Sequence, residues 1–144
     1  TDDPSDMTTD IIGRLSGDSS IDTLTVTLDN STITADSQTA VDAVIDPQTS
    51  YPGDGTLTAA VSGDRYLILN DVPSGGSWGT ISAKKNDIIS YNGTTWSVSF
   101  DAANTSTTEH TTNTTTMDKL KWNGSQWINA YEGTYNSGFW RIYL

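Results

Sequence analysis

The feature that most constrains the fold is a short motif that occurs twice: an aromatic residue, Asn-Gly, two further residues and Trp. Residues 87–100 (DIISYNGTTWSVSF) align with residues 118–131 (DKLKWNGSQWINAY) at a fixed offset of 31. Asn-Gly accepts positive φ at both central positions of a two-residue turn, so it is a strong hairpin signal. Each copy therefore predicts an antiparallel hairpin in which the aromatic residue before the turn faces the Trp after it.

Other segments carry strand patterns without the motif. Residues 65–69 (RYLIL) are branched or aromatic and lie between turn-forming pairs, and residues 139–144 form a similar run at the C-terminus. Leu24, Val26 and Leu28 recur at every second position, which is the period of a strand with one buried face. We expect a strand at each of these places.

Two segments near the N-terminus are less defined. Residues 39–45 fit a helix or a strand equally well. Apolar residues within 11–15 have the spacing of one short helical turn, which Gly13 and Gly17 limit because glycine is a poor helix former.

The composition changes near residue 50. Residues 1–50 hold ten Asp, one Arg and no aromatic residue, whereas residues 51–144 hold all five Trp, all six Tyr and both Phe. Aromatic side chains bury the most surface per residue, so the second part can build a core. We expect residues 1–20 to be an acidic tail or linker and residues 21–144 to be a single β domain, with 51–144 as its aromatic-rich core part.

These patterns predict an all-β fold: a small antiparallel sandwich or open barrel built of consecutive hairpins, with an acidic, partly disordered N-terminal segment. Strand alternation gives the expected core. Its members are Leu67, Leu69, Ile81, Ile89, Trp96, Val98, Leu120, Trp127, Trp140 and Ile142.

The segment 102–116 (AANTSTTEHTTNTTT) has low complexity. Seven of its residues between positions 107 and 116 are Thr, and it offers little to bury. The composition predicts an exposed loop or an extended edge strand.

Charge and residue usage exclude several classes of function. A net charge of −11 argues against nucleic acids and anionic membrane surfaces, which attract Lys and Arg clusters. The absence of cysteine removes disulfides, thiolate metal sites and a Cys nucleophile, and the single histidine, His110, makes a histidine relay improbable. We therefore expect no metal site and no cofactor, and no partner that is a nucleic acid or a membrane.

The carboxylates give catalysis little support. A glycan hydrolase needs two of them flanking one bond, and the candidates are Asp87, Asp101, Glu109, Asp118 and Glu132. Asp87 and Asp118 stand at strand entrances, where Asp is an ordinary turn residue. No calcium-binding loop motif is present in the sequence. We therefore expect the chain not to be an enzyme. A glycan hydrolase fragment is kept as an alternative behind the two hypotheses given at the end of this section.

The aromatic residues allow two interpretations. They can hold small hairpins together, or some of them can form an exposed surface that contacts a sugar ring or a partner protein. The candidates for such a surface are Trp78, Tyr91, Trp122, Tyr135 and Tyr143.

Three segments together resemble a known family. They are residues 63–72 (GDRYLILNDV), residues 78–102, which contain NDIISYNGTTW, and residues 119–144 (KLKWNGSQWINAYEGTYNSGFWRIYL). Their order and spacing resemble a module of virion structural proteins in T4-like tailed phages, including cyanophages. The resemblance covers about two thirds of the chain, residues 51–144. It implies a non-enzymatic structural or attachment protein in the neck, tail or baseplate.

Two hypotheses about function follow. In the first, the chain is a virion structural protein that assembles with copies of itself, as a homo-oligomer, or with other virion proteins, in a particle made in the host cytoplasm and released. In the second, it is a carbohydrate- or receptor-binding β module that contacts a glycan through exposed aromatic residues.

Overall fold

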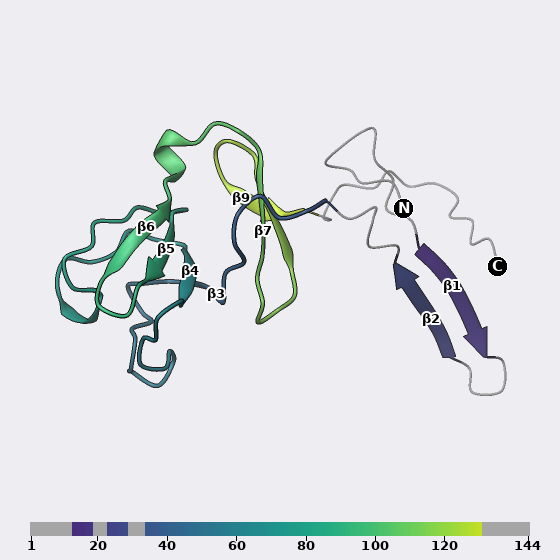
Figure 1. The fold of residues 1–144 in the computed structure, drawn as a ribbon, viewed down its shortest axis with the longest axis horizontal. Coiled ribbons are helices and arrows are strands. Elements are labelled where there is room, and N and C mark those ends of the chain that lie inside the picture. Colours follow the sequence, from purple (N-terminus) through teal and green to yellow (C-terminus); the bar gives the residue numbers. More distant parts are fainter. Residues whose placement is uncertain (1–12, 19–22, 29–33, 131–144) are drawn as a thin grey trace. The chain divides into compact units, whose positions relative to one another are not determined.

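The computed structural model describes residues 13–18, 23–28 and 34–130 (Figure 1). The chain divides into two units, one of residues 36–129 and the other of residues 1–35 with 130–144. Among the described residues every regular element is a strand or a short 3-10 turn, so the expected all-β class is confirmed. The expected division into a 1–20 tail and a 21–144 domain stays a prediction.

The described part of the N-terminal unit is one hairpin. Strand β1 (Gly13–Asp18) pairs antiparallel with β2 (Thr23–Leu28), and Gly13 lies opposite Leu28. The predicted strand at 23–28 is confirmed, whereas the helical turn allowed for residues 11–15 is wrong where they are described, at 13–15. Pairing with β2 gives the β1 backbone its hydrogen bonds, whereas an isolated helical turn of this length is unstable in water.

The unit of residues 36–129 contains two sheets. The first has the order β3 (Ala43–Ile45), β4 (Arg65–Ile68), β5 (Ile88–Tyr91), β6 (Trp96–Phe100), with β3 parallel to β4 and the other pairs antiparallel. Residues 43–45, which fitted a helix or a strand, are thus a strand.

The second sheet has the order β7 (Glu109–Thr112), β8 (Lys119–Trp122), β9 (Trp127–Asn129), and all its pairs are antiparallel. Both Asn-Gly hairpins are confirmed, but the positive φ expected for both residues of each pair is wrong for the asparagines, because only Gly93 and Gly124 adopt it, at 94° and 92°. Tyr91 lies opposite Trp96 in the first, and Trp122 lies opposite Trp127 in the second.

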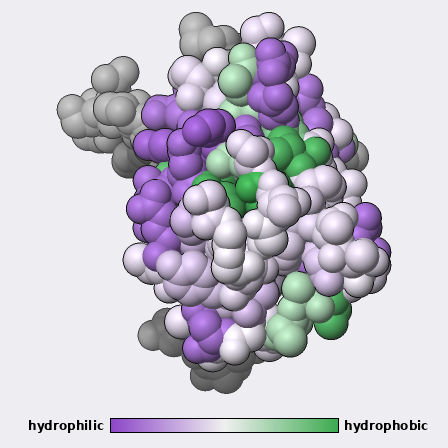
Figure 2. All heavy atoms as spheres, turned by 90° about the vertical axis from the view of Figure 1, so that its left-hand side faces the viewer, coloured by the Kyte–Doolittle hydropathy of each residue, from purple (hydrophilic) through white to green (hydrophobic). Residues whose placement is uncertain are grey.

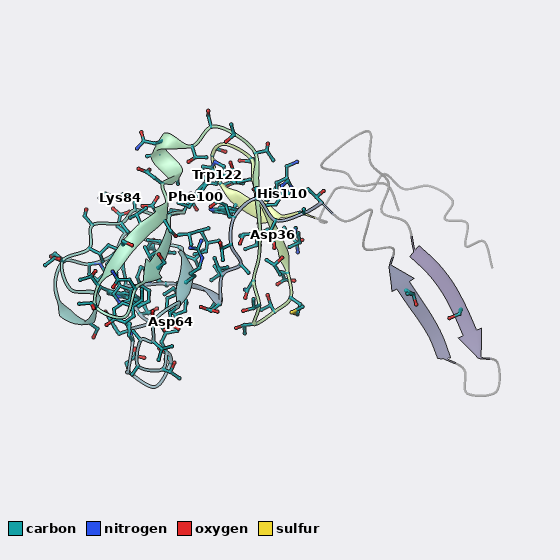
Figure 3. The ribbon with its side chains drawn as sticks, viewed as in Figure 1. Asp36, Asp64, Lys84, Phe100, His110 and Trp122 are labelled. Atoms are coloured by element: carbon teal, nitrogen blue, oxygen red, sulfur yellow. The ribbon has the colours of Figure 1, made fainter. Side chains whose placement is uncertain are left out.

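The central strands β4 and β5 bury side chains on both faces. On one face loops cover a cluster of seven buried residues, which we call the loop-side cluster: Ile45, Tyr66, Ile68, Trp78, Ala83, Ile89 and Trp96. On the other face lies the inter-sheet cluster of Val41, Leu67, Ile88, Phe100 and Trp122. Because Trp122 comes from β8 and its ring lies 5.5 Å from that of Phe100, the inter-sheet cluster joins the two sheets as in a sandwich (Figure 3).

A β-bulge in β6 lets one strand serve both clusters. Ile89 pairs with Val98 but Ile88 pairs with Phe100, so Ser99 is an extra residue in the ladder. The Ser99 hydroxyl donates a hydrogen bond of 3.0 Å to the Ile88 carbonyl at this point. Such an insertion reverses side-chain alternation, and Trp96 and Phe100 therefore enter opposite faces of the sheet.

The expected core is partly right. Leu67, Ile89 and Trp96 are buried, and Ile81, Leu120 and Trp127 pack half-buried against the two clusters. Leu69 and Val98 are 47% and 37% exposed, so their prediction as core residues is wrong. Leu69 lies just beyond β4, and Val98 lies on the edge strand β6 beside the bulge. Trp140 and Ile142 lie outside the described residues.

The Thr-rich segment is an extended edge in its second half. A stretch that we call the strap (residues 36–42) runs along β7: Ser37 and Gln38 donate backbone hydrogen bonds to the His110 carbonyl, and Val41 donates to that of Thr112. The hydroxyl of Thr111 donates to the Thr39 carbonyl at 3.1 Å. The side chain of Thr111 is 0% exposed, so the expectation that this segment has nothing to bury is wrong there.

Two neighbouring residues test where the buried part of this segment ends, since Ile68 is buried and Leu69 is exposed. Ile68→Ala should lower the free energy of unfolding by about 2–5 kcal/mol, because the Ile68 side chain is fully buried. The matched variant Leu69→Ala should change it by less than about 1 kcal/mol. Urea denaturation followed by tryptophan fluorescence measures both values, and equal losses would contradict the exposure of the Leu69 side chain.

Candidate functional site

A pocket of about 280 Å³ lies where the turn of the β5–β6 hairpin meets the loop that follows β4. The hairpin contributes Tyr91, Thr94, Thr95 and Trp96, and the loop contributes residues 77–81. On the side of the molecule that Figure 2 shows, hydrophobic residues gather above the centre, with hydrophilic residues to their left and residues of intermediate hydropathy below them. The strand pairing and the turn thus bring aromatic and hydroxyl side chains to one place.

Aromatic rings form the inner part of the pocket. The Trp96 ring lies 5.1 Å from that of Trp78 in an edge-on arrangement, 5.0 Å from that of Tyr91 and 5.5 Å from that of Tyr66. The loop reaches this position through glycines with positive φ on both sides of the turn at Trp78, namely Gly76 at 68° and Gly79 at 67°. Side chains with a Cβ disfavour that conformation, so the sequence Gly-Ser-Trp-Gly favours this turn.

One indole group differs from the others. Three of the four described tryptophans donate their indole N–H to a backbone carbonyl: Trp78 to Pro47, Trp122 to Thr105 and Trp127 to Asn86, at 3.1, 2.9 and 2.9 Å. The Trp96 indole N–H has no such acceptor among the described residues. Arg65 Nε is the one buried side-chain nitrogen or oxygen without a partner there. Because the Trp96 indole nitrogen is not among the buried atoms without a partner, its N–H is in contact with solvent. Trp96 lines the pocket, which is therefore open to solvent beside this ring.

The rim of the pocket carries hydroxyl groups and no charge. Ser77, Thr80, Thr94 and Thr95 are exposed, and their hydroxyls make no hydrogen bond within the described part of the chain. The Asn92 side-chain oxygen accepts from the backbone N–H groups of Thr94 and Thr95 at 2.9 and 2.8 Å and so fixes the turn. The arrangement offers hydrogen bonds to a ligand but no ionic contact.

The sequence-predicted contact residues separate into three groups. Trp78 and Trp122 are 1% and 2% exposed, so the expectation that they are exposed is wrong, because each ring packs into a cluster and each indole N–H is paired inside. Tyr91 is half-buried and lines the pocket together with Trp78, whereas Trp122 lies in the inter-sheet cluster. Tyr135 and Tyr143 lie outside the described residues.

Sequence reasoning missed Trp96, Thr94 and Thr95 as pocket residues. The Asn-Gly turn already predicted that Trp96 faces Tyr91 across the hairpin. The missing information was the covering loop, because nothing in the sequence places residues 77–81 beside this hairpin.

The candidate carboxylates have structural contacts. Asp87 is 4% exposed and accepts from the backbone N–H groups of Lys84 and Ala102 at 2.8 and 2.9 Å. Asp101 accepts from Ala103 N and Asn104 N and caps the 3-10 turn Ala102–Asn104. Within the described ranges no group of three or more His, Cys, Asp or Glu side chains could hold a metal ion. Glu132 lies outside those ranges.

Glu109 holds the strap onto β7. Its carboxylate accepts hydrogen bonds from Ser37 Oγ at 2.6 Å, Gln38 Nε2 at 3.1 Å and Thr107 Oγ1 at 3.0 Å. The hydrogen bond from Ser37, followed by that from Gln38, holds the pKa of Glu109 below its ordinary value. A salt bridge joins the strap to β8, where Lys119 Nζ lies 2.5 Å from Asp36 Oδ1 (Asp36 and His110 are labelled in Figure 3).

Comparisons of the chain with protein-family models, with curated proteins and with solved structures find no match. In the part of the chain that the structure describes, no helix has the length and apolar character needed to span a membrane.

The strap contacts predict a pH dependence of stability. A carboxylate whose pKa is lowered by folding stabilises the native state above its unfolded pKa, about 4.3 for Glu. This contribution is lost as the pH falls through the lower folded pKa of Glu109. Unfolding free energies of the wild type and Glu109→Gln should therefore differ at pH 7 and converge as the pH falls below about 4.3. Asp118→Asn is the control, because it removes a charge from an exposed side chain. A difference in unfolding free energy between the wild type and Glu109→Gln that stays equally large at low pH would contradict a stabilising role of the Glu109 carboxylate.

Proposed function

We propose that the chain is a non-enzymatic structural and assembly protein of a tailed-phage virion, in the neck, tail or baseplate. The resemblance of residues 63–72, 78–102 and 119–144 to such proteins supports the proposal. Where these residues are described, they supply β4, both Asn-Gly hairpins and Trp122 of the inter-sheet cluster. The resemblance therefore concerns the framework of the fold rather than a catalytic group.

The observation that carries the proposal is the open edge strand β6. It is the last strand of its sheet, and no described residue pairs with its outer edge. The backbone of Tyr91 in β5 bonds away from β6, because its carbonyl accepts from Gly63 N and its N–H donates to the Asp64 carbonyl. Its partner in β6, Trp96, therefore directs its backbone groups to the outer edge. By the alternation of an antiparallel ladder, Val98 does the same. Ser97, Val98 and Ser99 are exposed and uncharged in a chain of net charge −11. An uncharged edge of this kind accepts a strand from another chain.

The N-terminal hairpin supports assembly in a second way. Its described sheet has two strands, β1 and β2. A two-stranded sheet is marginal in water unless a further strand or layer covers it. In the proposal a copy of this chain or a neighbouring virion protein supplies that cover, while the acidic charge keeps the free subunit soluble before assembly.

A charge placed on the edge tests the role of β6. Val98→Lys should abolish concentration-dependent oligomers, because a lysine on an edge strand disfavours pairing with another chain. Val61→Lys makes the same substitution at a loop residue that is 61% exposed, and it should leave the oligomers unchanged. Size-exclusion chromatography with light scattering measures the mass. A wild type that stays monomeric at high concentration, or equal effects of the two variants, would refute assembly through β6.

Truncation tests the N-terminal hairpin separately. Deletion of residues 1–20 removes β1 and leaves β2 without its partner strand. The oligomer should dissociate at concentrations where the full chain assembles, while near-ultraviolet circular dichroism from the aromatic residues of the 36–129 unit stays unchanged. Assembly at full strength after truncation would exclude β1 from the interface.

A second candidate function is a carbohydrate- or receptor-binding module. The specific observation that favours it is the uncharged pocket beside the β5–β6 turn, with Tyr91 and Trp96 inside and hydroxyl groups at the rim. Trp78 and Trp122, which the sequence predicted to lie on an exposed aromatic surface, are buried and do not contribute to such a surface.

A further inference from the structure

The pocket beside the β5–β6 turn has the chemistry of a small amphipathic ligand. Its inner surface is aromatic, its rim carries the hydroxyls of Ser77, Thr80, Thr94 and Thr95, and the Trp96 indole N–H has no acceptor among the described residues. A pyranose ring matches this arrangement, because its C–H groups form an apolar face and its hydroxyls both donate and accept hydrogen bonds around the edge. Ligand sites commonly combine aromatic walls with a few polar groups in this way.

The charge of the pocket selects among sugars. No Asp, Glu, Lys, Arg or His lines it. The chain as a whole carries −11, so its field repels anionic ligands, and no local cation compensates for this. A neutral sugar therefore fits better than a uronic acid or a sialic acid.

Size limits the ligand to about one ring in the main pocket. Its volume of about 280 Å³ lies at the lower end of small-molecule sites. A second hollow of about 200 Å³ shares Gly79, Thr80 and Ile81 with it and adds Val72, Ser74 and Ser82, also without a charged residue. The two hollows meet along residues 79–81, so a second sugar unit of the same glycan can lie in the neighbouring hollow.

We propose that the pocket binds the terminal ring of a neutral glycan, with the next sugar unit in the adjacent hollow. This inference rests on the second candidate function, which it makes specific, and it does not depend on assembly through β6. Thr94 and Thr95 bind the sugar hydroxyls, Trp96 donates its indole N–H, and Tyr91 contacts the ring.

The test uses the full 144-residue chain labelled with ¹⁵N. Nuclear magnetic resonance spectra are recorded during titration with the methyl glycosides of glucose, galactose, mannose and N-acetylglucosamine, with maltose and cellobiose, and with galacturonic acid. The indole N–H signal of Trp96 should shift on addition of at least one neutral sugar and saturate in the millimolar range, as expected for a ligand of so few atoms. Where that sugar is glucose, maltose or cellobiose should bind more tightly than the single ring, and galacturonic acid should leave the signal in place.

Matched threonine variants locate the site. Thr94→Val with Thr95→Val keeps the shape of both exposed side chains, removes two hydroxyls and should weaken binding about tenfold. Thr114→Val removes a hydroxyl from an exposed residue outside the pocket and should change nothing. Because the variants are isosteric, the unchanged signals of the remaining amides verify folding. Thr80→Val is a further single test at the boundary of the two hollows.

Several outcomes would overturn the proposal. They are an unmoved Trp96 signal with every neutral sugar, equal weakening in the pocket and control variants, or binding of galacturonic acid as tight as that of the neutral sugars. The Val98→Lys variant separates the two functions, because it should lose self-association and still bind the sugar. Sugar binding without any oligomer would refute assembly alone, and an oligomer without sugar binding would refute the pocket alone.

Discussion

Burial of both faces of β4 and β5 is the constraint on which the rest of the 36–129 unit depends. A sheet with two apolar faces needs two covering layers. The second hairpin covers one face through Trp122, and the loops after β3 and β4 cover the other through Trp78 and its neighbours. The bulge at Ser99 lets a single strand contribute to both layers. The pocket exists because one covering layer consists of loops, which leave a gap beside the hairpin turn.

The sequence was sufficient for the local part of this fold. The Asn-Gly pairs at 92–93 and 123–124 predicted both hairpins and their aromatic pairs, although in each pair only the glycine has positive φ and the asparagine side chain accepts a hydrogen bond from the turn backbone. It was insufficient for contacts between distant segments. The pairing of the strap with β7 joins residues more than seventy positions apart, such as His110 and Ser37. Neither the polar strap nor the Thr-rich segment has an apolar pattern that would reveal the pairing.

The candidate site shows the same division. Aromatic residues were correctly recognised as the important side chains, but alternation alone cannot tell a buried tryptophan from an exposed one when a sheet is covered on both sides. Trp78 and Trp122 pack into the two clusters, and the backbone carbonyls of Pro47 and Thr105 accept their indole N–H groups, so neither ring leaves a buried polar atom unpaired. Trp96 differs in having no such acceptor among the described residues, a property that depends on the folded loops and has no counterpart in the sequence motif.

The position of the strap in the chain has a consequence for synthesis. Residues 36–42 leave the ribosome long before β7. In the Ser37–His110 contact, for example, the two partners are 73 positions apart in the sequence. At about 5–20 residues per second, the strap waits several seconds for its partner. During that time β3 to β6 can form their own sheet, whereas the strap still exposes backbone groups that a nascent neighbouring chain can bind. Translation speed through residues 43–112 therefore sets how long the growing polypeptide is open to exchange of this segment between chains.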